Sequence, residues 1–417
     1  MILERDNWQE IFATIKKNKL RTFLTCMGVG WGIFMLVIML GAGNGLKHGI
    51  LNDFAGTATN SFFMWAQKTS KSYKGMKPGR NFNFNNADAM ALGQLDEIGV
   101  LSPQNSLGDY DGSNNVTRGI KVGAFQVRGS YPNISKIEYI KLAKGRFLNE
   151  LDIKEKRKIC IIGPRVREVL FKKDEETIGQ YIKVNGIYFK VVGEMITTGN
   201  GEQAREQSSR IQIPFSTFQN AFNYGDVIGW FSISSKAGMP CSVTEEKVMS
   251  VLKDRHKIAL EDNLALGHWN METEFVKLNG LFAGIEGLIW FVGIGTLIAG
   301  VIGISNIMLI IVKERTKEIG VKRAIGATPY DVITQIMLES VFLTAIAGII
   351  GLWVSILLLE GLDNLIGRDA PMFQNPTVDI SVAIKALIIL IVAGAFAGLI
   401  PARKASAVNP VEALRSE

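Results

Sequence analysis

The stretch most suited to a specific chemical role is a run of charged and apolar residues, with two glycines, at residues 314–328. Charged groups buried at an interface typically cost about 2–5 kcal/mol when truncated, and glycine lets a partner backbone approach closely. The pattern therefore predicts docking of a partner protein, while the alternative is a solvated helix that only anchors the chain at the membrane surface. The residues concerned are the charged Glu314, Arg315, Lys317, Glu318, Lys322 and Arg323, the apolar Ile319, Val321, Ala324, Ile325 and Ala327, and the glycines Gly320 and Gly326.

Residues that could catalyse a reaction or bind a metal form no recognisable pattern. The three histidines, His48, His256 and His268, are far apart and lack the spacing of zinc ligands. The sequence contains no nucleophile elbow, no H-E-x-x-H and no Walker A pattern G-x-x-x-x-G-K-[ST]. We therefore expect a chain that is not an enzyme, with no catalytic residue, cofactor-binding residue or metal ligand of its own.

Four apolar runs without charged residues predict how the docking segment is held. They cover residues 22–46, 287–312, 340–359 and 386–402. A helix needs about 20 apolar residues to cross the roughly 30 Å hydrocarbon core of a bilayer. The fourth run reaches this length when Lys385 is taken as a snorkelling residue. The sequence therefore predicts an α-helical membrane protein with four transmembrane helices.

Basic residues indicate the orientation of these helices. Residues 1–21, 313–338 and 403–417 carry five, five and three lysines and arginines respectively, whereas residues 361–379 carry only Arg368. Basic segments tend to stay in the cytoplasm, so we expect both termini there. The predicted order is a cytoplasmic amphipathic helix (1–21), transmembrane helix 1 (22–46), a large external domain (47–280), transmembrane helix 2 with a stalk (281–312), a cytoplasmic coupling loop (313–338), transmembrane helix 3 (339–360), a short external loop (361–379), transmembrane helix 4 (380–402) and a cytoplasmic tail (403–417).

The external domain is predicted to be mixed α/β. Runs rich in β-branched residues predict strands at residues 158–162, 181–184, 188–192 and 210–213, and Asn185-Gly186 predicts a hairpin turn between the second and third. Apolar periodicity predicts helices at residues 88–95 and 243–256. Polar stretches predict loops at residues 66–87, 102–117 and 197–209.

Two further features of the external domain bear on its chemistry. Its 31 basic and 25 acidic residues are interspersed, which argues against nucleic-acid binding despite the net charge of +7. Cys160 and Cys241 could form a disulfide outside the cell. The alternative for Cys160, inside a strand-like run, is a small buried hydrophobe.

Several segments resemble one family in order along the chain. Residues 306–328 (NIMLIIVKERTKEIGVKRAIGAT) resemble the permease signature of the MacB/FtsX/LolCDE group of ABC transporters. Residues 17–32 and 400–417 resemble the start of the first span and the C-terminal signature of that group. In the external domain the resemblance to the MacB-type periplasmic core lies in LAKGRFLNELD, ICIIGPRVREVLF, TIGQYIKVNGIYFKVVGEM and RIQIPFSTF, and LKDRHKIALEDN matches the stretch before span two.

The resemblance, which is closest to a MacB-like permease without the fused ATPase domain, implies a function. It implies a dimeric inner-membrane permease that passes ATP-driven motion to a periplasmic domain of the MacB type between helices 1 and 2. ATP and Mg would be bound by a separate ABC ATP-binding subunit, which residues 314–328 would contact. The other implied partners are a second permease chain, identical or different, the lipid bilayer, a periplasmic adaptor and an outer-membrane channel for export.

Two other functions within the family stay open, together with the identity of the substrate. One is a lipoprotein-releasing permease of the LolC/LolE kind. The other is an FtsX-like activator of a cell-wall hydrolase that transports nothing, for which the external domain is larger than expected. Outside the family, a membrane-anchored enzyme or adhesin is the remaining alternative.

Overall fold

A computed structural model describes residues 19–54, 56–107, 115–197, 202–366 and 373–407. The chain forms two compact units. The membrane unit comprises Met1–Gly49 and Leu281–Glu417, and the external unit comprises Ile50–Gly280. The amphipathic helix predicted for residues 1–21 falls almost wholly outside the described residues.

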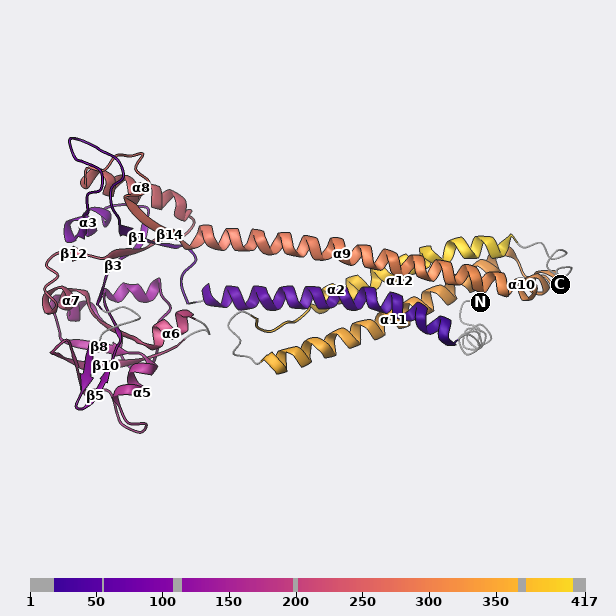
Figure 1. The fold of residues 1–417 in the computed structure, drawn as a ribbon, viewed down its shortest axis with the longest axis horizontal. Helices are drawn as coiled ribbons and strands as arrows, with labels where there is room; N and C mark the ends of the chain where they lie inside the picture. Colours follow the sequence, from indigo (N-terminus) through magenta and orange to yellow (C-terminus); the bar gives the residue numbers. More distant parts are fainter. Residues whose placement is uncertain (1–18, 55, 108–114, 198–201, 367–372, 408–417) are drawn as a thin grey trace. The chain divides into compact units, whose positions relative to one another are not determined.

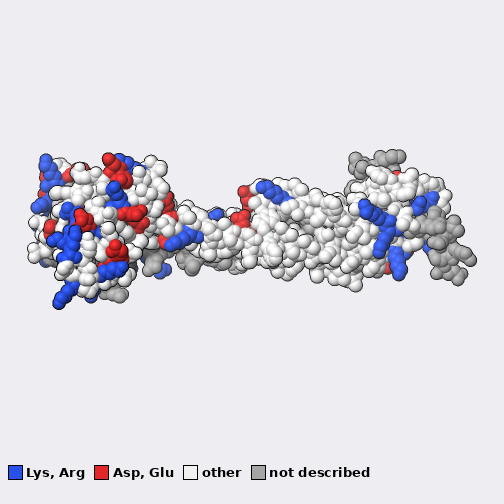
Figure 2. Space-filling view, turned by 90° about the horizontal axis from the view of Figure 1, so that it is seen from above, with Lys and Arg blue, Asp and Glu red and all other residues white. Residues whose placement is uncertain are grey.

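Four helices of the described chain are long and apolar enough to cross a bilayer, which confirms the predicted four-helix membrane protein. They belong to α2 (Lys19–Phe54), α9 (Met271–Glu314), α11 (Pro329–Ile366) and α12 (Ile380–Ser406). The short helix α10 (Thr316–Ala324) lies between α9 and α11 in the sequence. Figure 2 shows a surface almost free of charge over the middle of these helices, with Lys and Arg gathered at one end.

The core of the membrane unit is made by apolar faces of all four long helices. Residues of α2 such as Ile33 and Leu36 are fully buried in the same cluster as Leu297 of α9 and Leu390 of α12. Helices α11 and α12 run side by side (Figure 1). Their contact is close because Gly394 faces Thr344 and accepts a hydrogen bond from Ser340 Oγ at 2.9 Å through its carbonyl.

The external unit is built on a mixed sheet, which confirms the predicted α/β domain between the first two membrane helices. Its strand order is β14-β1-β13-β3-β6-β11-β8-β10-β9-β4-β5, with β7 paired to β10. The pairs β6/β11 and β8/β10 are parallel, and the other pairs of this sheet are antiparallel. The strands are β1 (Ser61–Ala66), β3 (Ile98–Leu107), β4 (Val116–Arg118), β5 (Lys121–Gly123), β6 (Gln126–Ser130), β7 (Lys141–Gly145), β8 (Ile159–Ile162), β9 (Tyr181–Val184), β10 (Ile187–Ile196), β11 (Arg210–Pro214), β13 (Trp230–Ser235) and β14 (Leu266–Asn270), and β2 (Phe84–Asn85) pairs with β12 (Val227–Ile228) separately.

Helices cover one face of this sheet with two apolar clusters. In one cluster Phe62 and Phe231 of the sheet pack with Val248 of α8, and in the other Ile211 packs with Val166 and Phe218. The helices of this unit are α3 (Asn86–Leu92), α4 (Glu150–Lys154), α5 (Pro164–Leu170), α6 (Glu202–Ser208), α7 (Phe215–Ala221) and α8 (Cys241–Arg255), with a 3₁₀ turn, η1, at Pro132–Lys136. Successive strand residues alternate between faces, and the second face carries a smaller apolar cluster that includes Ile161 and Met195.

Several local predictions are confirmed in this unit. Asn185 and Gly186 both have positive φ, 42° and 88°, and close the β9/β10 hairpin as the turn chemistry requires. The predicted strands correspond to β8, β9, β10 and β11, and the predicted helices to α3 and α8. Cys160 and Cys241 are free thiols buried in different apolar clusters, so the structure contains no disulfide between them.

Two loop predictions were wrong. Residues 98–107 form the ten-residue strand β3, whose polar residues Ser102, Gln104 and Asn105 are fully buried. Residues 202–208 form helix α6, a highly polar helix. In the membrane unit, residues 313–338 of the predicted coupling loop contain the short helix α10 and the beginning of α11 at Pro329.

Candidate functional site

The predicted docking segment folds as helix α10 between two tight turns. Helix α9 ends at Glu314, and Arg315 takes the N-cap position of α10. After α10 the backbone turns at Gly326, whose φ of +115° is accessible to glycine at little cost. Thr328 Oγ1 then donates a hydrogen bond of 2.6 Å to the Asp331 carboxylate at the start of α11.

Arg315 connects α10 to α11 through ion pairs on both sides. Its guanidinium donates two hydrogen bonds to Glu318, at 2.8 and 3.0 Å, and one to Glu339 at 3.3 Å. The Glu339 side chain is 3% exposed, although it stands at the edge of an apolar helix. A buried carboxylate is costly without a cationic partner, so Arg315 and Glu339 fix α10 against α11.

A second contact holds the other end of α10. Arg323 donates a hydrogen bond of 2.7 Å to the backbone carbonyl of Ser406, at the end of α12. Ile319 and Gly320 are buried against the core of the membrane unit. Val321 and Ile325 point the other way, with 41% and 82% of their surface exposed.

The structure therefore divides the predicted docking residues into two groups. Arg315, Ile319, Gly320 and Arg323 hold α10 in place. The members on the exposed side are Glu314, Lys317, Glu318, Val321, Ala324, Ile325 and Gly326, with Lys322 and Ala327 half-buried and Lys322 3.8 Å from Glu318. Glu339 was not among the predicted residues, and its signal in the sequence is a lone carboxylate directly before the apolar run 340–359.

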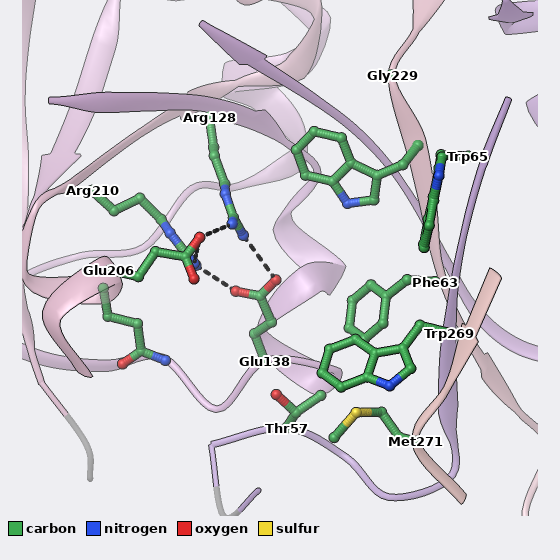
Figure 3. Close-up of a pocket in the computed structure, with 12 residues that line it drawn as sticks. Thr57, Phe63, Trp65, Arg128, Glu138, Glu206, Arg210, Gly229, Trp269 and Met271 are labelled. Carbon is green, nitrogen blue, oxygen red and sulfur yellow. Dashed lines mark hydrogen bonds and ion pairs between the residues drawn. The ribbon is translucent and has the colours of Figure 1, made fainter. Parts of the chain in front are cut away.

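A second candidate site is a pocket of about 320 Å³ on the face of the sheet opposite to α5, α7 and α8. Figure 3 shows its two unlike walls. Aromatic side chains from β1, β14 and β13 form one wall, and charged side chains from β6, β11, α6 and the segment after η1 form the other. No sequence prediction pointed to this pocket, because its walls come from residues up to about 200 positions apart.

The aromatic wall follows directly from strand register. Trp65 of β1 is paired with Trp230 of β13, and Phe63 of β1 is paired with Trp269 of β14. The rings of Phe63 and Trp269 have their centroids 6.1 Å apart. Met271, the first residue of α9, completes this wall.

The charged wall is a closed network of two arginines and two glutamates. Arg128 lies 3.3 Å from Glu138 and 2.5 Å from Glu206, and Arg210 lies 2.5 Å from Glu138 and 3.6 Å from Glu206. The Arg128 guanidinium also lies 5.5 Å from the centre of the Trp230 ring, so it joins the two walls.

The two arginines favour the ionised form of Glu138. Burial alone would raise the pKa of Glu138, but the charges of Arg210 and Arg128 outweigh burial and hold that pKa below its ordinary value. Removing one member would leave an uncompensated buried charge, which typically costs about 3–5 kcal/mol. In the part of the chain that the structure describes, no three His, Cys, Asp or Glu side chains are grouped so as to hold a metal ion.

Two family models match successive parts of the chain. The family model for the MacB-like periplasmic core domain matches residues 22–242, and the model for the FtsX-like permease C-terminal domain matches residues 290–410.

The similar proteins are larger than this chain. The pyoverdine export ATP-binding/permease protein PvdT of Pseudomonas entomophila is 27% identical over 96% of the chain and 58% of its own length. The macrolide export ATP-binding/permease protein MacB of Campylobacter fetus is 30% identical over 99% of the chain and 62% of its own length. The chain thus spans less than two thirds of these relatives.

Among solved structures, the periplasmic region of MacB from Actinobacillus actinomycetemcomitans is similar, with 20% identity and a TM-score of 0.44, over 55% of this chain and 97% of that one. Since the first family match alone covers more than half of the sequence and a second covers most of the remainder, the chain belongs to the MacB/FtsX family of ABC transporter permeases.

Proposed function

We propose that this permease transmits the ATP-driven motion of a separate ATP-binding subunit to its external unit, and so exports a substrate. The observation that carries the proposal is helix α9, a single helix of 44 residues from Met271 to Glu314. At about 1.5 Å per residue it is about 66 Å long, roughly twice the hydrocarbon thickness of about 30 Å. A continuous helix of this kind can carry a displacement along its axis.

Each end of α9 is connected to one of the two candidate sites. Met271 lines the pocket of the external unit, and Glu314 precedes Arg315, which anchors α10. We assign α10, with its exposed Val321 and Ile325, as the surface that docks in the ATP-binding subunit. That subunit would bind ATP and Mg, and these 417 residues themselves contain no Walker A pattern.

The remaining parts of the proposal concern orientation and partners. The distribution of basic residues supports cytoplasmic termini and an external unit in the periplasm. Relatives named for the export of pyoverdine and of macrolides support outward transport. We include a second permease chain, a periplasmic adaptor and an outer-membrane channel as the further members of the assembly.

A proline in α9 tests force transmission. Leu281 is 57% exposed, so replacing it removes little packing. Leu281→Pro removes a helix hydrogen bond and costs about 3 kcal/mol in a helix interior, whereas Leu281→Ala keeps the helix. After reconstitution with the ATP-binding subunit, the proline variant should still bind that subunit and lose export. Export at the parental rate by Leu281→Pro would contradict transmission through α9.

A further inference from the structure

All three tryptophans of residues 50–280 line the single pocket described above. Trp65 and Trp269 keep 37% and 41% of their surface exposed, and Trp230 is half-buried. None of the three apolar clusters of this unit includes any of these tryptophans. Exposed, rigid aromatic side chains supply contact area at low entropic cost and are typical of recognition surfaces. The fold therefore leaves these rings available for a ligand.

The opposite wall limits the charge of that ligand. Its two guanidinium groups and two carboxylates carry no net formal charge, and every one of them is within 3.6 Å of an opposite charge. A net charge on the ligand would enter a partly desolvated site without a free counter-charge, which is unfavourable. An anion would also approach Glu138 and Glu206, and a cation would approach Arg128 and Arg210. A neutral ligand is favoured.

The same wall also limits the polar groups of the ligand. Guanidinium groups only donate hydrogen bonds and ionised carboxylates only accept them, so this wall offers both kinds side by side. A hydroxyl group donates and accepts, and several hydroxyls can therefore meet Arg128 and Glu206 at once. A hydrocarbon ligand would desolvate these groups without replacing their hydrogen bonds to water.

We propose that the pocket binds a neutral sugar, with the C–H face of a pyranose ring stacked on the tryptophans and its hydroxyls turned to the Arg–Glu network (Figure 3). A sugar ring combines an apolar face with a rim of hydroxyls, which matches the two walls. The volume of about 320 Å³ lies at the lower end of the range of ligand pockets and suits a mono- or disaccharide. This inference concerns binding alone and does not depend on the proposed export function.

Binding is measured on the full chain in lipid nanodiscs, without ATP or an ATP-binding subunit. The four tryptophans of the rest of the sequence, Trp8, Trp31, Trp290 and Trp353, are replaced by Phe so that emission reports the pocket. Maltose, cellobiose and N,N′-diacetylchitobiose are the free-sugar probes, and octyl glucoside represents a lipid-linked sugar. We expect a saturable change in tryptophan emission with at least one of these, and a response to octyl glucoside alone would assign a lipid-linked source.

Variants separate recognition from a general effect on folding. Trp269→Ala should weaken binding of the responding sugar about tenfold, which is the effect of losing one stacked ring. Because this variant lacks one of the reporting tryptophans, its affinity is measured by titration calorimetry. Glu206→Gln gives the network a net positive charge, so it should shift preference from glucose toward the anion glucuronate. Glu246→Gln, at an exposed position on α8, is the matched control and should change neither the affinity for the sugar nor the preference between glucose and glucuronate. Melting temperatures show whether each variant is folded.

Three outcomes would overturn the proposal. The first is that no sugar binds at millimolar concentration. The second is tighter binding of the aromatic acid indole-3-acetate than of any sugar. The third is an equal response to octyl glucoside and to an octyl polyethylene glycol ether, which would assign the pocket to apolar chains.

Discussion

Arg315 donates a hydrogen bond to Glu339 over 24 positions of sequence, and so fastens helix α10 to membrane helix α11. Glu339→Gln would remove the buried charge that Arg315 neutralises. Because Glu318 remains as a second partner, we expect a loss near the lower end of the range for buried pairs, about 3 kcal/mol. ATP turnover coupled to transport should fall while the ATP-binding subunit still binds. Thermal unfolding and coupled turnover measure the two effects, with the exposed Glu360→Gln on α11 as control. Equal coupling in both variants would mean that the ion pair does not position α10.

The exposed side of α10 should determine binding of the ATP-binding subunit. Ile325 is 82% exposed, so Ile325→Asp should leave folding unchanged and weaken complex formation at least about tenfold if the side chain is a buried anchor. Leu365→Asp, at an 84% exposed position near the end of α11, is a matched control that should bind normally. Affinity is measured by co-purification and titration. If Ile325→Asp binds like the parent, α10 serves as a membrane anchor and not as the docking surface.

The orientation can be tested by labelling with an impermeant thiol reagent. In a background without the three native cysteines, Lys173→Cys and Asn375→Cys should react in intact spheroplasts, and Thr328→Cys should react only after lysis. All three positions are exposed in the structure, so accessibility within the fold does not decide the result. Labelling of Thr328→Cys in intact cells would reverse the proposed topology.

Stability of the external unit should fall at acid pH through Asp88. Burial raises the pKa of Asp88, but hydrogen bonds from His256, Arg255 and the backbone of Asn85 outweigh burial and lower that pKa below its ordinary value. The unfolded state therefore holds the proton more tightly than the native state. The stabilisation is complete above the unfolded pKa and is lost as pH falls through the native one.

Asp88→Asn should accordingly destabilise the external unit at neutral pH by about 3 kcal/mol and flatten its pH dependence below pH about 4, the ordinary pKa of an aspartate. Melting followed by tryptophan emission at neutral and acid pH measures both changes. Asp96→Asn is the control, because the Asp96 side chain is fully exposed. A pH profile like that of the parent would show that other carboxylates dominate acid unfolding.

The purified chain by itself should hydrolyse no ATP. The glycine-rich loop and lysine that hold phosphates are missing from the 417 residues. Vanadate-sensitive turnover should begin when the cognate ATP-binding subunit is added. Turnover by the chain in preparations that mass spectrometry shows to be free of other proteins would contradict this expectation.

The sequence predicts elements whose signals are local. Apolar length was sufficient for the four membrane helices, and Asn185-Gly186 was sufficient for the β9/β10 hairpin. Strand β3 was not predicted because apolar and polar residues do not alternate along it. The buried Gln104 donates a hydrogen bond to Ser102 of the same strand at 3.0 Å and accepts one from Ser130 of β6. These partners satisfy the polar groups of a segment whose sequence is typical of a loop.

The two candidate sites also differ in whether their residues are neighbours in the sequence. Residues 314–328 are contiguous, and their alternation of charges and apolar groups is visible in the sequence. In the pocket, Glu206 was predicted to lie in a loop, but it belongs to helix α6 and pairs with Arg128 of strand β6. Tertiary pairing decides such sites, and a single sequence does not contain that pairing.

Strand β1 gives the pocket a consequence for folding. Phe62 and Met64 point into the apolar core, and the alternating residues Phe63 and Trp65 line the pocket. Because side chains alternate with a period of two, sliding β1 by one residue would send Phe63 and Trp65 into the core and turn Phe62 and Met64 outward. A chain paired in the wrong register would therefore lack the pocket altogether. Ligand binding in the pocket would thus report that β1 has paired in its native register.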